Sequence, residues 1–378
     1  MHLTAWYPCI DETSGVFILQ QAKALQSIGL RVGLVFSRIE GLTQLQRTSF
    51  WKGVPQFSKT TDPVPTTGFK SWSLPGAKHL VSHFNRRMLI NRYLAYERWQ
   101  GTPDVLHSHV ALETGLATQQ IARRRQIPYV ITEHSSEVLN GIACSDRVEK
   151  ARKVYSEAEC VIAVSEVLGE QILQISPDAN VRIIGNMVGA EVFKLQATPR
   201  LESGGIIIVS VGSLTINKRY HDAIDALSRL PRDVLDRLEY RIIGEGVERH
   251  RLEKLVQSTG VQTTFLGNLM HREAMLEMAQ ADIFLHPSAY ETFGIVAAEA
   301  MSLGIPIVAT RCGGLEKFVT NEVGTLVDVG DVEDLHDALS AMINDFQWWK
   351  GRKPSIAHLA ELQFHEQVVA TKLAEIYR

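Results

Sequence analysis

The sequence has little of what marks the more specialised protein classes. Its 378 residues include four cysteines, which stand far apart and form no C-x-x-C pair: Cys9, Cys144, Cys160 and Cys312. This spacing argues against a disulfide framework or a zinc site and is compatible with a reducing cytoplasm. The chain also lacks a charged-then-apolar leader and an apolar run long enough to span a bilayer. We therefore expect a cytosolic protein that is at most peripheral to a membrane.

A strong excess of charge of one sign is also absent. The formal net charge is −3, so the chain as a whole has no general attraction to nucleic acid. The charge is nevertheless uneven, with a balance of +4 in residues 1–190 and −7 in the remainder. An apolar content of 45% and a charged content of 21% are typical of a globular protein. The length suits two domains, and their different charge suggests different partners.

Short apolar runs alternate with helical patterns along most of the chain, which predicts parallel β-α units. The first series has expected strands near 2–6, 31–36, 104–109, 128–132, 160–164 and 181–185. A linker at 188–204 precedes a second series, with a short helix at 315–319 and expected strands near 205–211, 240–244, 263–267, 282–286, 306–310 and 324–327. The sequence therefore predicts an α/β protein with two Rossmann-like domains that face each other across a cleft. We expect these domains at 1–190 and 191–345, with the helical tail 346–378 packing back on the first.

Two segments of the first half depart from this alternation. Residues 38–77 are rich in Pro, Ser and Thr and are expected to form a long excursion with short irregular strands. Residues 77–98 are expected to form a basic helix with a modest apolar stripe. Such a helix is a candidate for contact with an anionic membrane surface, although a solvated helix that packs one face on the sheet is the simpler interpretation.

The most informative stretch is residues 281–304, which reads as a short strand, a loop and a nearly apolar helix. Glu299 is the one charge in that helix, and burying a carboxylate among apolar neighbours is costly unless it is paired. Glu291 lies on the loop after the strand, where open α/β sheets bind ligands. The two acids suggest a polar ligand across the N-terminus of the helix. A solvated loop acid and an outward-pointing helix glutamate would give the same spacing, so the spacing alone is weak.

Other residues of the second half fit a mononucleotide diphosphate. Lys218 follows an apolar strand and a turn, where its ammonium group can meet phosphate oxygens. The main-chain N–H groups of Thr292, Phe293 and Gly294 stand at a helix start and offer further donors, together with the helix dipole. Glu299 is then placed to accept hydrogen bonds from both ribose hydroxyls. In the same arrangement Glu291 can hold hydroxyls of a sugar.

A dinucleotide site is not expected. The segment RIIGEGVER has a strand, a glycine turn and a helix start, but Arg249 stands where a G-x-G-x-x-G fingerprint needs its third glycine. No suitable acid follows at the interval that ribose binding requires, so nicotinamide binding is not predicted.

In the first half, His109 and His134 both follow the ends of apolar strands, on the expected ligand-binding edge. A lone histidine there is more often structural than catalytic. His134 has more polar neighbours, among them Glu133 and Ser135, and is the better candidate. Gly15 stands between a strand and a helix start and can cradle a phosphate, although a single glycine is weak evidence.

As a set, these motifs resemble a known family. The segments VGSLTINK, RIIGEG, TTFLGN, DIFLHPSAYETFGIVAAEAMSLGIPIVAT and CGGLEKFV closely resemble the second half of the retaining glycosyltransferases of family 4, which have the GT-B fold. The first half resembles the family more loosely, through its glycine turn, the DVLHSH strand end, the TEH loop and the GN before the linker.

The resemblance implies that the second domain binds a nucleotide-sugar donor and the first binds an acceptor. Glu299 would hold the ribose and Lys218 the diphosphate. Glu291 would hold the sugar hydroxyls, and His134 would lie over the sugar, which makes Lys218, Glu291 and His134 the catalytic candidates. The other expected donor-binding residues are Gly15, Ser213, Arg219, Gly244, Leu266, Asn268, Leu269, Thr292, Phe293, Gly294 and Ile295.

Enzymes of this kind generally need no metal, because a basic side chain and a helix dipole replace it. Their retention of configuration is usually explained by front-face attack, in which the leaving phosphate helps to deprotonate the acceptor. Two positions depart from the family pattern. Ser213 stands where an arginine is common, so Lys218 or Arg219 must carry more of the phosphate contact, and Gly15 stands where the family has a glycine pair.

We therefore expect a retaining glycosyltransferase that moves a hexose from a UDP- or GDP-sugar to a glycan or lipid-linked acceptor in cell-surface polysaccharide biosynthesis. The alternatives are a nucleotide-sugar epimerase, a non-catalytic sugar-nucleotide-binding protein, and a pyridoxal-phosphate-dependent glycan phosphorylase, for which the chain is short. The sequence does not predict the base, the sugar, the acceptor or the linkage.

Overall fold

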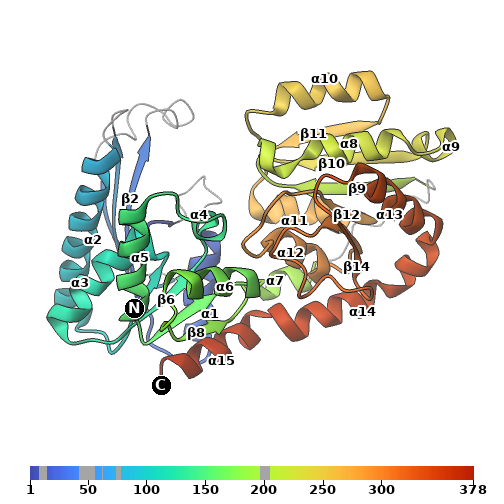
Figure 1. Ribbon diagram of the computed structural model, residues 1–378. Helices are drawn as coiled ribbons and strands as arrows, with labels where there is room; N and C mark the ends of the chain where they lie inside the picture. Colours follow the sequence, from blue (N-terminus) through green and yellow to red (C-terminus); the bar gives the residue numbers. More distant parts are fainter. Residues whose placement is uncertain (8–14, 42–55, 62, 74–77, 196–204) are drawn as a thin grey trace. The chain divides into compact units, whose positions relative to one another are not determined.

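The computed structural model describes residues 1–7, 15–41, 56–61, 63–73, 78–195 and 205–378 (Figure 1). The chain divides into two compact units. The first comprises Met1–Gly185 with Val369–Arg378, and the second comprises Asn186–Val368. Each unit contains its own largely parallel sheet, as the alternation of apolar runs and helical patterns predicted. Part of the predicted linker, residues 196–204, lies outside the described residues.

The sheet of the first unit has the strand order β3-β4-β2-β1-β5-β6-β7-β8. Its predicted strands are present, most of them shorter than expected: β1 (His2–Thr4), β2 (Leu34–Gly41), β5 (Leu106–His109), β6 (Tyr129–Glu133), β7 (Cys160–Ala163) and β8 (Val181–Ile183). The helices are α1 (Val16–Ser27), α2 (Lys78–Gln100), η3 (Ala111–Gly115), α3 (Leu116–Arg125), α4 (Ser136–Leu139), α5 (Ser145–Ser156) and α6 (Glu166–Ile175).

Two regular strands lie where an irregular excursion was expected. β3 (Gln56–Thr60) and β4 (Thr66–Ser73) are antiparallel, and β4 pairs in parallel with β2 along its whole length. The prediction was therefore wrong for this part of 38–77. Pro63 and Pro65, which suggested irregular structure, lie between the two strands, where a missing N–H removes no ladder hydrogen bond. Residues 42–55, 62 and 74–77 of the segment lie outside the described residues.

The sheet of the second unit has six parallel strands in the order β11-β10-β9-β12-β13-β14. All were predicted: β9 (Ile206–Val211), β10 (Leu238–Ile243), β11 (Thr263–Gly267), β12 (Ile283–His286), β13 (Ile307–Thr310) and β14 (Gly324–Val327). The helices are α7 (Ala190–Phe193), η4 (Ile216–Lys218), α8 (Tyr220–Ser228), α9 (Arg232–Leu235), α10 (Arg249–Thr259), α11 (His271–Ala279), α12 (Ile295–Ser302), α13 (Val332–Asn344) and α14 (Phe346–Phe364).

The core of this unit explains why its strands read as continuous apolar runs. Strand residues Ile208, Leu285 and Val308 are fully buried and cluster with Ile224 of α8 and Leu339 of α13. Strands of a parallel sheet are covered on both faces, so successive side chains all meet apolar neighbours.

The predicted helix at 315–319 is absent. Its residues form one hydrogen-bonded turn, in which Phe318 N and Val319 N both donate to Leu315 O, at 3.0 Å and 2.9 Å. A single turn gains too few hydrogen bonds to offset the entropy of helix nucleation. The pattern is instead that of a tight loop after β13.

The C-terminal segment 346–378, which was expected to pack as a whole on the first domain, is divided between the units. α14 lies in the second unit, where a Cβ on Gly304 would stand 2.5 Å from Lys353 O, which indicates a close approach of helix and loop. The residues from Val369 onward, in the last part of α15 (Glu366–Ile376), belong to the first unit. There the Tyr377 hydroxyl lies 2.6 Å from His107 Nδ1.

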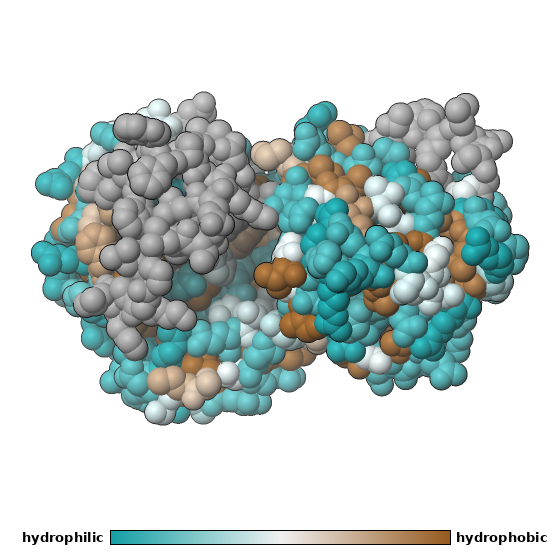
Figure 2. All heavy atoms as spheres, turned by 90° about the horizontal axis from the view of Figure 1, so that it is seen from above, coloured by the Kyte–Doolittle hydropathy of each residue, from teal (hydrophilic) through white to brown (hydrophobic). Residues whose placement is uncertain are grey.

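Polar surface predominates in the view of Figure 2, with apolar residues interspersed. Three exposed large apolar side chains follow consecutive strands of the second sheet: Ile216 after β9, Val247 after β10 and Met270 after β11. None of the helices formed by the described residues combines the length and the hydropathy needed to cross a bilayer.

In both sheets the strand order reverses next to the first strand of the unit. The reversal falls between β1 and β5 in the first sheet and between β9 and β12 in the second. In open α/β sheets ligands bind outside the carboxyl ends of the strands at such a switch point. Gly15 follows β1, Lys218 follows β9 and Glu291 follows β12, whereas His134 follows β6 and Gly244 follows β10, which are not at the switch points.

Candidate active site

An ion pair between Lys218 and Glu291 lies at the switch point of the second sheet. Lys218 ends η4, which follows β9, and Glu291 lies on the loop between β12 and α12. Because β9 and β12 are neighbours, the loops at their carboxyl ends meet, and Lys218 Nζ donates to Glu291 Oε1. Both residues were predicted from their motifs, but their direct contact was not.

Two residues that the sequence analysis missed also bind Glu291. His286 Nε2 lies 3.0 Å from Glu291 Oε1, and Ser288 Oγ donates to the same oxygen at 3.2 Å. Burial alone would raise the pKa of Glu291, but the hydrogen bond from His286 and the charge of Lys218 outweigh burial and lower this pKa to about 2. Glu291 is therefore a carboxylate across the physiological pH range. The sequence feature that could have identified His286 is its position at the end of an apolar strand.

His286 is itself neutral in this arrangement. It is 2% exposed, and burial lowers its pKa more than the hydrogen bond with Glu291 raises it. A neutral imidazole that faces a carboxylate donates from its protonated nitrogen, which assigns the proton to Nε2. His286 thus acts as a fixed hydrogen-bond donor that orients Glu291.

The N-terminus of α12 lies directly after this cluster. Gly294 is its N-cap with φ +78°, a left-handed conformation that favours glycine, and Ile295 is the first helical residue. The first N–H groups of a helix have no intrahelical partner, so they can donate to an anion. Glu291 N donates to Cys312 O at 2.8 Å, which ties this loop to the one after β13.

The side chain of Phe293 has a packing role. It is 4% exposed and meets two other aromatic rings, Phe318 at 5.6 Å and Phe364 at 5.8 Å between ring centroids. Gly314 passes so close that a Cβ there would lie 2.8 Å from the backbone of Phe293. The aromatic cluster therefore buries the side chain of Phe293 and holds the backbone of 292–294 in place.

Glu299 is buried in α12, as its apolar neighbours predicted, and its partner is His271. His271 Nε2 lies 2.7 Å from Glu299 Oε1, and His271 is the first residue of α11. The hydrogen bond with Glu299 raises the pKa of His271, and burial opposes this increase. His271 was not predicted. The contact supplies the pairing that a buried carboxylate requires, and it engages one of the two carboxylate oxygens.

Three glycine turns meet beside η4. Gly244 has φ +137°, and its N–H donates to Gly267 O at 2.8 Å, which joins the ends of β10 and β11. A Cβ on Gly244 would lie 2.0 Å from Gly212 O, so only glycine fits where the turn after β10 passes the turn after β9. Ser213 is exposed next to Gly212.

The residues expected around the base lie at the end of β11. Leu266 is the penultimate residue of that strand and is half-buried. Asn268 and Leu269 follow it, Asn268 exposed and Leu269 half-buried. Thr292, also predicted, is half-buried between Glu291 and Phe293.

Arg219 has its own partner within the unit. Its Nε donates to Asp222 Oδ2 at 2.6 Å, and a Cβ on Gly330 would stand 3.0 Å from its guanidinium. The residue has φ +50° and caps α8. The structure brings Lys218 and Glu291 together, and it gives Arg219 a carboxylate partner on α8.

In the first unit, Gly15 and His134 lie near the switch point between β1 and β5. Gly15 caps α1 with φ +82°, and a Cβ there would stand 2.6 Å from the backbone of Trp6. His134 follows β6, and burial lowers its pKa to about 3, so the ring is neutral. Its ring contacts Phe17 and Trp6 at centroid distances of 5.0 Å and 6.1 Å.

Glu133 fixes the backbone that carries His134. Its Oε1 accepts from His134 N at 3.0 Å and Ser135 N at 2.9 Å, and its Oε2 accepts from Tyr155 Oη at 2.7 Å and Ala111 N at 3.1 Å. Burial raises the pKa of Glu133, and these four hydrogen bonds oppose the increase. Its role is thus structural, because these contacts join the loop after β6 to α5 and to the start of η3.

One cluster of histidines could in principle hold a metal ion. Within the described residues, the one group of three potential metal ligands that lie close together is His2, His107 and His109. It lies in the first unit and includes none of the predicted donor-binding residues.

Comparisons with known proteins place the chain in a family. A model of the glycosyl transferases group 1 matches residues 191–347, and a glycosyl transferase 4-like domain matches residues 13–187. The chain belongs to this family of glycosyltransferases, and the two sheets are those of the GT-B fold. It is therefore a transferase that takes its sugar from a nucleotide-sugar donor.

Two curated proteins are similar to this chain in sequence, and one solved structure is similar to it in fold. The glycogen synthase of Mycobacterium tuberculosis is 31% identical over 287 residues, covering 73% of this chain and 68% of that protein. The putative teichuronic acid biosynthesis glycosyltransferase TuaC of Bacillus subtilis is 26% identical, covering 94% of this chain and 90% of its own. Anabaena HepE, solved in complex with UDP-glucose, superposes with a TM-score of 0.71 at 18% identity, covering 99% and 97%.

Proposed function

We propose that this protein is a retaining hexosyltransferase that uses a UDP- or GDP-sugar and elongates a glycan or lipid-linked acceptor of a cell-surface polysaccharide. The observation that carries the proposal is the Lys218–Glu291 pair beside the N-terminus of α12, at the switch point between β9 and β12. This arrangement combines a cation for a diphosphate, backbone donors for its oxygens and a carboxylate for sugar hydroxyls.

In this proposal each part of the donor meets a matching group. Lys218 and the free N–H groups of Ile295 and its neighbours neutralise the diphosphate, and this positive charge makes a metal unnecessary. Glu299, oriented by His271, accepts hydrogen bonds from the ribose. The UDP-glucose complex of HepE favours UDP-sugars as the first donors to test.

The low pKa of Glu291 limits what it can do in the reaction. A carboxylate with a pKa of about 2 cannot act as a general acid near neutral pH. We assign it the binding and orientation of sugar hydroxyls. When the donor arrives, Lys218 exchanges part of its contact with Glu291 for the phosphate, and the leaving phosphate takes the proton of the acceptor hydroxyl on the same face of the sugar.

His134 is assigned a hydrogen bond to the sugar of the donor. Because its ring is neutral, it can donate from one nitrogen and accept at the other, but it adds no positive charge near the anomeric carbon. A neutral polar group is suitable there, since the transition state of glycosyl transfer carries positive charge on the sugar.

The acceptor proposal is supported by a curated relative. TuaC, which spans most of both chains, is assigned by its name to teichuronic acid biosynthesis. The described chain offers no membrane-crossing helix, and α2 buries Leu89, Tyr93 and Tyr96 while Phe84 is exposed. We propose a cytoplasmic location, with α2 meeting anionic headgroups through its arginines and Phe84. Liposome flotation that does not depend on anionic lipid would remove the membrane contact.

The test is a donor-panel assay with NMR of the product. UDP- and GDP-hexoses are incubated with the enzyme, and the anomeric coupling of the released or transferred sugar is recorded at early times. Retention of configuration with one donor is expected. Inversion would overturn the retaining mechanism. An epimerised nucleotide sugar without transfer would show that the protein does not use these nucleotide sugars as donors for transfer.

Site variants test which residues carry the activity. Glu291→Gln keeps the size of the side chain and removes its charge, and Lys218→Ala removes the cation. Both are expected to lower transfer strongly. Lys254→Ala, at an exposed position on α10, is the matched control and should leave the rate unchanged. Folded Glu291→Gln and Lys218→Ala proteins with wild-type transfer rates would show that the site is elsewhere.

A further inference from the structure

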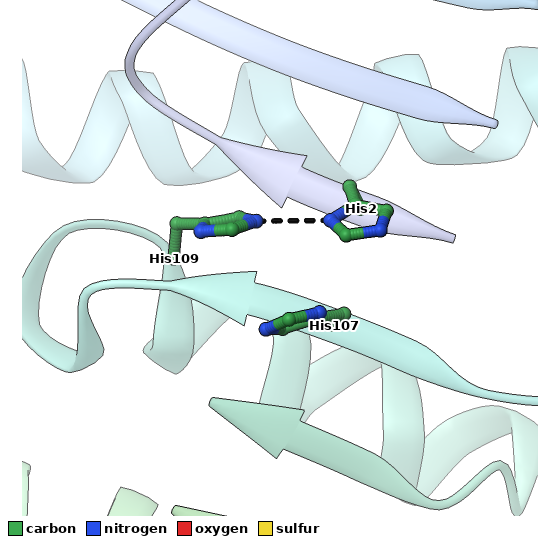
Figure 3. A group of neighbouring side chains, drawn as sticks. All are labelled: His2, His107 and His109. Atoms are coloured by element: carbon green, nitrogen blue, oxygen red, sulfur yellow. Dashed lines mark hydrogen bonds between the residues drawn. The ribbon is translucent and has the colours of Figure 1, made fainter. Parts of the chain in front are cut away.

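Three histidines of the first unit lie on one face of its sheet (Figure 3). The register of β1 and β5 pairs His2 with His107, and His109 stands two residues further along β5. Because side chains of a strand alternate between faces with a period of two, all three rings share one face. Each residue is at most 2% exposed.

The hydrogen bonds of these rings argue against a metal ion between them. His107 Nδ1 lies 2.6 Å from the Tyr377 hydroxyl and its Nε2 lies 2.6 Å from Thr132 Oγ1. His109 Nε2 and His2 Nδ1 point at each other across 2.9 Å, as the dashed line of Figure 3 shows. A shared metal would need lone pairs that are already used in these bonds.

The contacts instead form a chain that ends at His134. His109 Nδ1 lies 3.3 Å from His134 Nε2, and the two rings are nearly parallel, 14° apart at a centroid distance of 5.6 Å. The chain of bonds therefore runs from His2 through His109 to His134. His107 lies beside these bonds, stacked on His109 at a centroid distance of 4.6 Å, and it hydrogen-bonds with the hydroxyl groups of Tyr377 and Thr132.

A chain of this kind couples the tautomers of its members. Burial lowers the pKa of all three rings, so each is neutral and carries one N–H. In each His–His contact one nitrogen must donate and the other accept. Since each contact joins an Nδ1 to an Nε2, only two arrangements satisfy both: every ring protonated on Nδ1, or every ring protonated on Nε2.

We propose that His109 and His2 are positioning residues that set the tautomer of His134 and so decide whether its Nδ1 donates or accepts a hydrogen bond at the donor sugar. With all protons on Nδ1, His134 presents a donor at that atom. With all protons on Nε2, it presents an acceptor. The inference rests on the proposed function, because that function assigns His134 a hydrogen bond to the sugar.

The positions of the three hydrogen-bonded histidines fit this role. His2 and His109 lie on β1 and β5, the strands that flank the switch point of the first sheet, and His134 follows the next strand, β6. A rigid sheet thus holds the two buried rings, while the loop fixed by Glu133 holds the third. A ligand contact whose tautomer and ring plane are fixed in advance costs less entropy on binding.

The tautomers can be read directly by NMR. Long-range proton–nitrogen spectra of protein with 15N-labelled histidine distinguish Nδ1–H from Nε2–H by the nitrogen shifts. In the wild-type protein without donor, His2, His109 and His134 are expected to share one tautomer. A different tautomer on any one of the three would overturn the proposal, whatever the activity of the enzyme.

Variants of His109 test the coupling. His109→Phe keeps an aromatic ring but removes both nitrogens, and it is expected to give averaged nitrogen shifts at His134 and an approximately tenfold loss in kcat/KM, the effect of about one hydrogen bond. His109→Asn places an amide near the lost Nδ1, which can hydrogen-bond with His134 Nε2 in either tautomer, and it should restore part of the rate but not a single tautomer. Tyr377→Phe removes a partner of His107 alone, and should leave the His134 spectrum unchanged.

Two results with variants would reject the proposed coupling of the histidine tautomers. An unperturbed His134 tautomer in folded His109→Phe protein would show that His109 does not set it. Stoichiometric binding of Zn²⁺ to the wild-type protein, lost in His107→Phe, would show that the cluster is a metal site. Because the spectra are recorded without donor, they remain informative if the Lys218 and Glu291 variants disprove the proposed function, and the reverse also holds.

Discussion

His271, the first residue of α11, hydrogen-bonds with Glu299 in the next helix, α12, with 2.7 Å between His271 Nε2 and Glu299 Oε1. The pair gives a buried carboxylate the partner that its burial demands. It also makes the expected ribose contact dependent on the charge of a histidine, since the hydrogen bond with Glu299 raises the pKa of His271.

This pair predicts a pH dependence with a defined sign. The raised pKa of His271 means that its stabilisation is complete below the ordinary histidine pKa of about 6.5 and is lost as pH rises through the folded value. We expect the free energy of unfolding and the affinity for UDP to fall as the pH rises through this pKa. The loss should be at most about 1 kcal/mol, because the partly exposed pair is screened by solvent. Denaturant titrations and calorimetry from pH 6 to 9 measure both.

His271→Gln is the control for that prediction, because it keeps a hydrogen-bond donor without a titratable charge. Its stability and UDP affinity should lack the step seen in the wild type. The same step in wild-type and His271→Gln proteins would assign the pH dependence to another group.

The Lys218–Glu291 pair predicts a coupled loss of donor affinity. Removing Lys218 takes away a phosphate cation and leaves Glu291 with His286 and Ser288 as its remaining partners. We expect UDP affinity to fall about 10- to 100-fold in Lys218→Ala, as hydrogen bonds to charged groups contribute about 1.5–3 kcal/mol. A double-mutant cycle with Glu291→Gln should give a non-zero coupling energy, and strictly additive effects would show that the two residues act independently.

Gly244 predicts a steric requirement at the meeting of two turns. An alanine there would place its Cβ 2.0 Å from Gly212 O, so one turn must move. We expect Gly244→Ala to lose at least about 2 kcal/mol of stability and to bind UDP more weakly. Gly351→Ala is the matched control, since a Cβ there meets nothing within 4 Å inside α14. It should be stabilising by roughly 0.5–1 kcal/mol, and equal effects of the two substitutions would contradict the steric account.

Phe293 predicts a separation of stability from donor binding. Its backbone is placed to bind the donor, whereas its side chain packs with Phe318 and Phe364. Phe293→Leu should therefore lower the free energy of unfolding by about 1–1.5 kcal/mol, because a smaller side chain fills the site less well. The affinity for UDP should remain that of the wild type at a temperature where both proteins are folded. A loss of affinity as large as the loss of stability would assign the side chain a role in the site.

Local patterns in the sequence carried most of the fold. Most strands of both sheets were predicted from apolar runs, because runs such as β5 and β12 are buried along their whole length and need no distant partner to be recognised. The expectation failed at β4, where prolines of a connecting loop concealed an eight-residue strand, and at 315–319, where one turn was read as a helix. The outcome at β4 depends on its pairing with β2, whereas at 315–319 a single turn gains too few hydrogen bonds to nucleate a helix.

By itself, the sequence determined the two β-α series and the glycine turns, and it marked Lys218, Glu291 and Glu299 as candidate site residues, because each is recognisable within a few neighbouring positions. The tertiary structure alone decided which side chains meet. Strand order brings Lys218 to Glu291 across 73 positions, and strand register brings His2 to His109 across 107. Such contacts, like that of His271 with Glu299 across 28 positions, follow from the packing of parallel strands and helices, which no short stretch of sequence encodes.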